Sequence, residues 1–236
     1  MNSRFLRSAP FFKESGLEKL ENSHVAVFGI GGVGSYVVEG LCRGGIGEIT
    51  LVDNDEYSIT NINRQLYATT QTIGKKKVEV AKDRALSINP DIKVNICDKF
   101  VLQNDIDGID FSKFDYVVDA IDTISGKIEI IKQSKLNGVP VISAMGAGNK
   151  LDQTAFKVAD IKDTKVCPLC KVMRKLLKDN GIDGLKVVYS EEKPIEPEIT
   201  GELKGNRPAP ASNSFVPPIV GLIIAGEVIK DLVKNN

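Results

Sequence analysis

A glycine-rich loop between an apolar run and a helical segment constrains the fold of this chain more than any other feature. Residues 25–28 have the pattern of a buried strand, which leads into the loop Gly29-Ile-Gly31-Gly32-Val-Gly34 and then a segment with helical spacing. Glycines let backbone N–H groups approach phosphates, and the amino end of a helix adds positive potential. Asp53 ends the next strand, where a carboxylate can accept hydrogen bonds from a ribose. The pattern predicts a nucleotide-binding fold.

Strand and helix signals alternate through the first two thirds of the chain. We expect strands at 48–53, 92–97, 116–119 and 139–143, and helices at 75–88 and 124–136. This alternation predicts an α/β fold with a Rossmann-like, mostly parallel sheet and helices on both faces. A short antiparallel or irregular C-terminal extension should follow, with a strand at 154–160, a basic helix at 172–177, an irregular surface segment at 181–213 and an apolar helix at 219–232.

Length and composition limit the remaining choices. With 236 residues, the chain should form a single domain, with a helical arm at 1–24, a nucleotide-binding core at 25–148 and a substrate-side extension at 149–236. Lys plus Arg and Asp plus Glu both number 31, which excludes a strongly basic coat but leaves room for a local basic patch. Four cysteines are too few for a disulfide scaffold. No signal peptide or membrane span is apparent, so we expect a cytoplasmic protein with no membrane partner.

Basic side chains distinguish ATP from NAD, both of which fit the glycine loop. Asn61-Ile-Asn63-Arg64-Gln65 follows the second strand, and Gly74-Lys75-Lys76-Lys77 opens the next helix. A triphosphate needs such cations, whereas a dinucleotide does not. Asp122 follows the fourth strand at the sheet edge where ligands bind, and a carboxylate beside a triphosphate usually accompanies Mg²⁺. The sequence therefore favours ATP and Mg²⁺, although the lysines could instead line a solvated helix face and Asp122 could be a helix cap.

Five motifs in order resemble those of the ubiquitin-activating-enzyme-like adenylyltransferases, which include activators of sulfur-carrier proteins. They are the loop 29–34, Asp53-Asn-Asp55, 61–65, 74–78 and Asp119-Ala-Ile-Asp122. Within this family the chain is most similar to the members that use ATP to dehydrate and cyclise the threonylcarbamoyl group of a tRNA adenosine beside the anticodon. Residues 60–65, 88–90, 118–122, 147–148 and 152–154 carry that likeness. The resemblance implies attack of a carboxylate on the α-phosphate, release of pyrophosphate and formation of an acyl-adenylate.

The resemblance also implies the roles of individual residues. The residues that it places against ATP are Gly29, Gly31, Gly32, Gly34, Asp53, Asp55, Asn61, Asn63, Gln65 and Lys77. The catalytic set that it implies is Arg7, Arg64, Lys77 and Asp122, and Asp122 would also hold Mg²⁺. Because Arg7 matches an arginine that reaches into the neighbouring subunit in this family, a homodimer is expected. Arg7 could equally be a surface arginine.

Several alternatives stay open. Many sulfur-carrier activators bind zinc through two CxxC pairs, whereas this chain has only Cys167-Pro-Leu-Cys170, which favours a tRNA substrate. The alternative is adenylation of the C-terminal carboxylate of a ubiquitin-like sulfur carrier, with a cysteine desulfurase or sulfur acceptor as a partner. An NAD-dependent oxidoreductase is disfavoured because the single histidine, His24, precedes the first strand. A non-catalytic nucleotide-binding scaffold is a further alternative. Basic residues at 162–178 could contact tRNA phosphates or form a solvated helix face.

Overall fold

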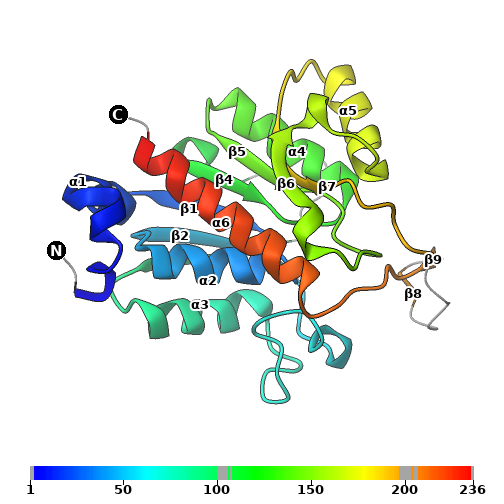
Figure 1. Cartoon of the computed structure of the whole chain (residues 1–236). Helices are drawn as coiled ribbons and strands as arrows, with labels where there is room; N and C mark the ends of the chain where they lie inside the picture. Colours follow the sequence, from blue (N-terminus) through cyan, green and yellow to red (C-terminus); the bar gives the residue numbers. More distant parts are fainter. Residues whose placement is uncertain (1–2, 100–105, 107, 197–202, 205–206, 235–236) are drawn as a thin grey trace.

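A seven-stranded sheet forms the centre of the computed structural model, which describes residues 3–99, 106, 108–196, 203–204 and 207–234 (Figure 1). The strand order is β3-β2-β1-β4-β5-β7-β6, and every neighbouring pair is parallel except β7 and β6. The strands are β1 His24–Phe28, β2 Glu48–Val52, β3 Lys93–Cys97, β4 Tyr116–Asp119, β5 Val141–Ala144, β6 Phe156–Asp160 and β7 Lys186–Ser190. The predicted α/β fold with a mostly parallel sheet is confirmed.

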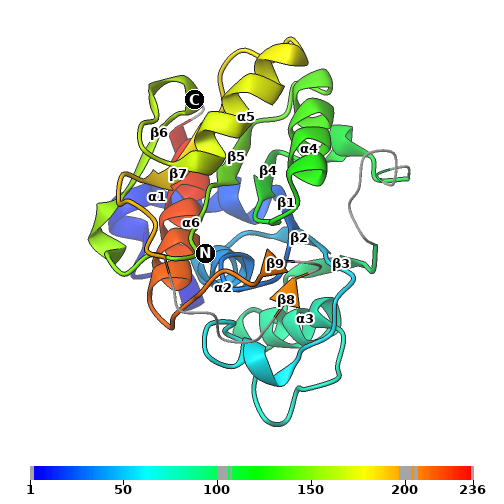
Figure 2. The ribbon, with the colours of Figure 1, turned by 90° about the vertical axis from the view of Figure 1, so that its right-hand side faces the viewer.

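Helices cover both faces of this sheet (Figures 1 and 2). The buried side chains of α1, α2, α3 and α6 form one hydrophobic core with the sheet, and those of α4 and α5 form a second. The helices are α1 Ala9–Glu21, α2 Gly34–Gly44, α3 Lys77–Ile88, α4 Ile124–Leu136, α5 Pro168–Asp179 and α6 Val216–Lys234. Short 3₁₀ turns are η1 Ser3–Phe5, η2 Ile59–Asn61, η3 Phe111–Lys113, η4 Gln153–Ala155 and η5 Ile161–Asp163. No helix in the described part of the chain is long and apolar enough to cross a membrane.

The central strand β1 shows why both faces must be covered. Val25 and Val27 belong to the core under α2 and α6, whereas Ala26 and Phe28 belong to the core under α4 and α5. Successive side chains of a strand point to opposite faces, so a strand that is apolar at every position needs cover on both sides. The uninterrupted apolar run at 25–28 is therefore the sequence signature of a central parallel strand.

The order of the strands creates the crevice in which a ligand can bind. β1 lies between β2 and β4, so the chain builds outward to β3 at one edge and then returns to build on the other side of β1. At such a point of reversal the connections leave in opposite directions, and an opening remains at the carboxyl ends of the strands. The glycine loop follows β1 and Asp122 follows β4, so both lie at this opening.

Two expectations about the elements of the fold need correction. Residues 181–213 are not wholly irregular, because β7 inserts into the sheet between β5 and β6 and is almost entirely buried. Only residues 187–189 in the middle of β7 are apolar. This run is too short to stand out from the polar residues on either side of it. The two-residue strands β8 Leu203–Lys204 and β9 Arg207–Pro208 follow; residues 197–202 and 205–206 lie outside the described residues. Helix α3 also begins at Lys77, two residues later than expected.

Close packing between α2 and α6 supports the glycine loop from below. Gly221 of α6 contacts the first turn of α2 so closely that a Cβ there would lie 2.4 Å from the Val33 carbonyl oxygen and 2.7 Å from Tyr36 Cβ. A Cβ on Gly40 of α2 would lie 2.6 Å from Ala225 Cβ. Small residues thus let the apolar C-terminal helix lie against the helix whose amino end faces the crevice. The predicted apolar C-terminal helix is present, and most of its apolar side chains are buried.

We expect Gly221→Ala to lower the free energy of unfolding by about 1–3 kcal/mol, because the added methyl group overpacks the α2–α6 contact. Gly226→Ala in the same helix is the matched control: its Cβ would meet no atom within 4 Å. Helix propensity should then raise stability by up to about 1 kcal/mol. Urea unfolding of the three proteins measures both effects, and equal changes in the two variants would contradict this account of the packing.

Candidate functional site

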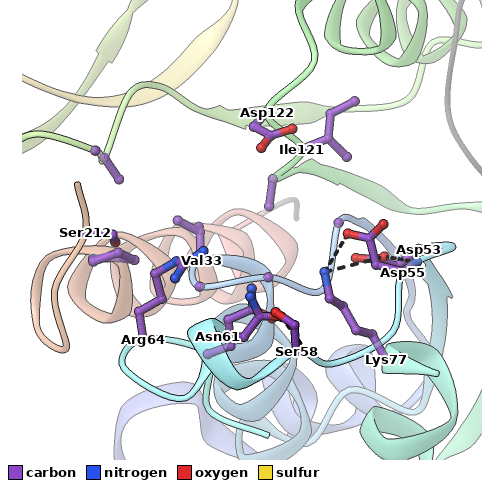
Figure 3. A pocket seen from close by; sticks show the side chains of 18 of the residues that line it. Val33, Asp53, Asp55, Ser58, Asn61, Arg64, Lys77, Ile121, Asp122 and Ser212 are labelled. Carbon is purple, nitrogen blue, oxygen red and sulfur yellow. Dashed lines mark hydrogen bonds and ion pairs between the residues drawn. The ribbon is translucent and has the colours of Figure 1, made fainter. Parts of the chain in front are cut away.

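A cavity of about 860 Å³ opens at the carboxyl ends of β1, β2 and β4. It brings together most of the residues that the sequence predicted for nucleotide binding or catalysis. Those that line it are Gly29, Gly31, Gly32, Asp53, Asp55, Asn61, Asn63, Arg64, Gln65, Lys77 and Asp122. They come from the glycine loop, the long connection between β2 and α3, and the turn between β4 and α4 (Figure 3).

The glycine loop has a conformation that side chains would prevent. Gly29 has φ of 88°, in the left-handed region, and its N–H donates to the Val52 carbonyl across the β1–β2 pair at 2.8 Å. A Cβ on Gly34 would lie 1.7 Å from the Gly29 carbonyl oxygen, which no structure tolerates. Gly34 does not line the cavity, so its contribution is to let the loop turn tightly into α2. The loop therefore brings backbone, rather than side chains, to the cavity floor.

Asp53 fastens the glycine loop to the following connection. Its Oδ2 accepts the Ile30 N–H at 2.6 Å and its Oδ1 accepts the Asp55 N–H at 2.9 Å. Burial raises the pKa of the Asp53 carboxyl, although the Lys77 ammonium and both backbone N–H groups act to lower it. The sequence predicted Asp53 as a ribose ligand. The structure adds that its two oxygens already orient the loop, with lone pairs left for further donors.

Lys77 reaches the cavity from the first turn of α3, and its side chain is only 7% exposed. Its Nζ lies 2.7 Å from Asp55 Oδ2 and 4.0 Å from Asp53 Oδ1 (Figure 3). The neighbouring lysines differ, because Lys76 pairs with Glu56 and Asp98 and Lys75 is exposed. Only Lys77 of the predicted lysine cluster lines the cavity. One buried cation is thus held between two carboxylates at the cavity wall.

Arg64 presents its guanidinium to the cavity from the connection between β2 and α3. One of its terminal nitrogens donates to the Thr60 carbonyl at 2.8 Å and to Asn63 Oδ1 at 2.9 Å. Asn61 Oδ1 accepts the Ser58 N–H at 3.2 Å, which closes the short turn that carries these side chains. These bonds limit the rotation of the arginine, so its fork is preorganised toward an anionic ligand.

Gln65 points to a ligand in a different way. Its side chain is buried and lines the cavity, and its Oε1 has no hydrogen-bond partner among the described residues. Buried side-chain oxygens in native structures nearly always have a partner. Its amide nitrogen faces the glycine loop, 3.9 Å from where a Cβ on Gly31 would lie. We therefore expect a bound molecule or water to supply the missing donor.

Asp122 faces these groups from the far wall of the cavity, opposite Asn61 and Lys77 (Figure 3). The turn that carries it rests on a buried ion pair: Lys127 Nζ lies 3.0 Å from Asp119 Oδ2, with the two side chains 1% and 0% exposed. Asp119 also accepts hydrogen bonds from Ser143 Oγ and from the Ile121 N–H at 3.3 Å. Removing one partner of a buried pair typically costs about 3–5 kcal/mol, so this pair fixes the turn firmly.

A segment near the C-terminus closes one side of the cavity, and sequence reasoning missed it. Residues 209–212 line the cavity, held by the Asn63 amide, which donates to the Ser212 carbonyl at 3.0 Å. Asn149 also exchanges two hydrogen bonds with Ala211, of 2.7 and 2.8 Å. No local pattern announces these contacts, because they join residues about 60 to 150 positions apart. Other lining residues that were not predicted are Ser58, Thr60, Lys99, Thr123, Ala147, Gly148 and Pro217.

Arg7 does not reach the cavity of its own chain. It lies in the segment after η1, where the Phe5 ring covers Gly45, just beyond the carboxyl end of α2. The cavity lies at the amino end of the same helix, and an 11-residue helix is about 16 Å long. Figure 1 shows the N-terminal segment at the opposite end of the sheet from β8 and β9. His24 also lies at the amino end of β1, where its ring contacts Thr50 Oγ1 at 2.8 Å.

Cys167 and Cys170 lie buried at the start of α5. The neighbouring Cys170 thiol and the backbone N–H groups of Cys170, Gly146 and Leu169 lower the pKa of the Cys167 thiol well below its usual range, despite burial. Donation to Cys167 and burial raise the pKa of Cys170. In the described residues, no three side chains of His, Cys, Asp or Glu lie together as a metal site would require.

Comparison with known proteins agrees with this geometry. A sequence profile of the ThiF family matches residues 3–236. The tRNA threonylcarbamoyladenosine dehydratase of Bacillus subtilis is 42% identical over 246 residues, which cover 100% of this chain and 96% of that protein. The enzyme of the same name from Haemophilus influenzae is 37% identical and covers 99% of this chain and 94% of its own length.

Solved structures agree as well. The E. coli tRNA N6-threonylcarbamoyladenosine dehydratase TcdA, in complex with ATP, superposes with a TM-score of 0.88 at 32% identity, covering 97% of this chain and 93% of that one. E. coli MccB with ATP superposes with a TM-score of 0.69 at 24% identity, covering 100% of this chain and 65% of that one. The second likeness concerns the fold alone.

We expect the Cys167 thiol to titrate well below its usual range, because the Cys170 thiol and neighbouring backbone N–H groups stabilise its thiolate. The ultraviolet absorbance of the thiolate, followed against pH, should show this step, and Cys167→Ser should remove it. Cys170→Ala deletes the S–H donor and should move the step to higher pH. A native protein with no thiolate absorbance below neutral pH would contradict the assignment.

Proposed function

Because the chain belongs to the ThiF family, we propose that it is an ATP-dependent tRNA threonylcarbamoyladenosine dehydratase that acts through an acyl-adenylate. The observation that carries this proposal is the convergence of Arg64, Lys77 and Asp122 around the glycine loop in one cavity. The dehydratases with 37–42% identity over nearly the whole chain identify the carboxylate substrate as a modified tRNA adenosine. A tRNA substrate implies that the enzyme works in the cytoplasm.

The residues that line the cavity favour one orientation of ATP. Its phosphates would lie over the glycine loop, where backbone N–H groups and the amino end of α2 provide positive potential. Asp53, at the end of β2, would accept hydrogen bonds from the ribose. Arg64 and Lys77 would neutralise the phosphates, and Lys77 would then exchange its 2.7 Å contact with Asp55 for a phosphate oxygen. The preorganised cations reduce the reorganisation needed during the reaction.

The reaction proceeds in two displacements. An oxygen of the threonine carboxylate attacks the α-phosphorus of ATP, the bond to the β-phosphate breaks, and pyrophosphate leaves with its electron pair. A nucleophilic atom of the same threonylcarbamoyl group then attacks the activated carbonyl, loses a proton and expels AMP, which closes the ring. The oxygen lost from the substrate departs with AMP, so the net change is a dehydration. The protein contributes chiefly positioning and charge neutralisation.

Mg²⁺ fits the chemistry of the donor groups. Asp122 presents an exposed carboxylate to the cavity, opposite Lys77, and Mg²⁺ in ATP sites is usually held by one or two carboxylates together with phosphates and water. Asp122 would hold the ion, and bound Mg²⁺ supplies additional neutralisation of phosphate charge. The buried Asp119–Lys127 pair keeps the Asp122 turn in place for this role.

A homodimer would complete the site with Arg7. Because Arg7 follows Phe5, which lies beyond the carboxyl end of α2 while the cavity lies at its amino end, Arg7 would act in the cavity of a second chain. An arginine supplied by a partner stabilises the developing charge of a phosphoryl transition state, as arginine fingers do in other nucleotide-dependent enzymes. The exposed apolar side chains of Leu6 and Phe11 beside it offer surface that a second chain would bury.

We expect the protein with ATP and Mg²⁺ to convert threonylcarbamoyladenosine in tRNA to its cyclic form, with AMP and pyrophosphate as products. Mass spectrometry of digested nucleosides measures the conversion. Asp122→Asn should lower the rate at least about 100-fold, as loss of a group that acts on the transition state commonly does. Asp83→Asn, an exposed carboxylate on α3, is the matched control and should leave the rate unchanged.

The same assay distinguishes the alternative substrate. If tRNA is not converted while a ubiquitin-like sulfur carrier promotes exchange of pyrophosphate into ATP, the enzyme adenylates a protein carboxylate instead. A cysteine desulfurase or sulfur acceptor would then be its partner. Full activity of Asp122→Asn would contradict the assignment of this aspartate.

Mixing two inactive variants tests whether Arg7 acts across a dimer. Arg7→Ala chains keep an intact Asp122, and Asp122→Ala chains keep an intact Arg7, so a mixed dimer contains one complete site. After denaturation and refolding together, the mixture should recover about a quarter of wild-type activity if the chains pair at random, since half the dimers then carry one working site of two. A mixture as inactive as its components would exclude action across the dimer.

A further inference from the structure

The helical layer formed by α4 and α5 carries a concentration of positive charge. Between positions 124 and 178 the sequence has 11 Lys and Arg but 4 Asp and Glu, although the whole chain has a formal net charge of zero. The lysines of this layer that are exposed are Lys132, Lys135, Lys162, Lys165, Lys171, Lys175 and Lys178, and we call them the lysine face. This stretch therefore has a formal net charge of +7 and the rest of the chain one of −7, so charge is segregated along this chain.

Helix α5 arranges three of these lysines in one stripe. Lys171, Lys175 and Lys178 follow i, i+4, i+7 spacing, which places them on one side of the helix over about 10 Å of its length. Cys170, Met173 and Leu177 lie on the other side and are buried against the sheet. The apolar side fixes the rotation of the helix, so the lysine stripe must face solvent.

These lysines are not neutralised within the described part of the chain. None of the seven forms an ion pair there, whereas Lys157, Lys186 and Lys230 each pair with a carboxylate. Asp163 and Asp179 are the acids nearest to the stripe in sequence, and they leave a clear excess of positive charge. The unpaired ammonium groups of the lysine face repel one another, and binding of a polyanion would relieve this repulsion.

Arg174 belongs to the same basic stretch but has a different role. Its NH1 nitrogen donates to the carbonyl oxygens of Thr164 at 2.9 Å and Ile161 at 3.4 Å. The guanidinium therefore holds the preceding loop against α5 rather than facing a ligand. This contact sets where Lys162 and Lys165 are displayed beside the stripe.

Helices α4 and α5, which carry most of the lysine face, both begin near the wall of the cavity. Helix α4 begins at Ile124, directly after Asp122 and Thr123, which line the cavity. At the start of α5, Cys167 lies beside Gly146, which directly precedes Ala147 and Gly148 in the cavity wall. Figure 2 shows α4 and α5 side by side on the same side of the sheet. The stripe thus starts near the cavity and leads away from it.

We propose that the lysine face binds the phosphates of the tRNA strand whose modified adenosine enters the cavity. The inference rests on the proposed function, because it assumes an RNA substrate. An RNA strand carries a negative charge at every nucleotide, and lysines at regular spacing on a flat helical layer can pair with successive phosphates without reading bases. Recognition of the modified adenosine then falls to the cavity, while the lysine face supplies affinity and orientation.

A variant that combines Lys171→Gln, Lys175→Gln and Lys178→Gln, called the α5 variant, tests this proposal. Binding of substrate tRNA, measured by fluorescence anisotropy over a range of salt, should weaken at least about tenfold at low salt. The slope of log affinity against log salt should fall by about 2, because each lost phosphate contact removes about 0.7–0.9 from the slope. The matched control is the triple variant in which Gln replaces Lys13, Lys82 and Lys234. It loses the same number of positive charges, but away from α4 and α5.

Turnover separates this proposal from the proposed function. If the α5 variant keeps the wild-type kcat but has a raised KM for tRNA, the result supports binding of tRNA by the lysine face. The kcat should not change, because the substitutions do not touch the ATP site. If wild type converts tRNA while the α5 variant binds it as the control does, the lysine face is wrong and the function stands. The wild-type protein could instead bind tRNA through the lysine face, in a salt-dependent way, and never convert it. That result would reject the proposed function but not the lysine face. A thermal unfolding midpoint equal to that of the wild-type protein confirms that each variant is folded.

Discussion

The Asp53 carboxylate is the contact on which the rest of the site depends. It joins three elements at one point: the glycine loop through the Ile30 N–H, the next connection through the Asp55 N–H, and α3 through Lys77. Burial opposes its ionisation, and the surrounding donors compensate. Any movement of Asp53 would displace both the glycine loop and the buried Lys77, so a single carboxylate couples two parts of the cavity wall.

The opposite wall of the cavity is built independently. The proposed reaction requires groups from both walls to act on one substrate. Asp122 rests on the Asp119–Lys127 pair inside the second core, between the sheet and the layer of α4 and α5. The glycine loop rests on the first core through the tight α2–α6 contact. The two cores share only the sheet, so the spacing across the cavity depends on the register of β1 and β4. Rigid strands are well suited to hold reacting groups at fixed separation.

Much of this architecture could be predicted because local rules act on short segments. Apolar runs at 25–28 and 116–119 must be buried on both faces, which indicates a parallel sheet, and the glycine loop has few uses besides phosphate binding. The glycine loop, Asp53 and Asp122 were predicted from their positions at strand ends, whereas the family resemblance implied the roles of the other cavity residues, such as Asn61 and Gln65. β7 was missed because its short apolar run lies among polar residues, and residues 209–212 were missed because Asn63 and Asn149 hold them from far away in the chain.

The sequence by itself determined the chemistry of this protein: the cations and carboxylates that could serve a triphosphate, and the basic stretch at 162–178. Tertiary structure alone decided which of those groups could act. It turned Lys77 inward and left Lys75 at the surface, tied Arg174 to its own loop while Lys171 faces solvent, and placed Arg7 beyond reach of its own cavity. The reason is geometric, because a side chain's charge is set by its type, whereas its partners are set by the packing of elements that lie far apart in the chain.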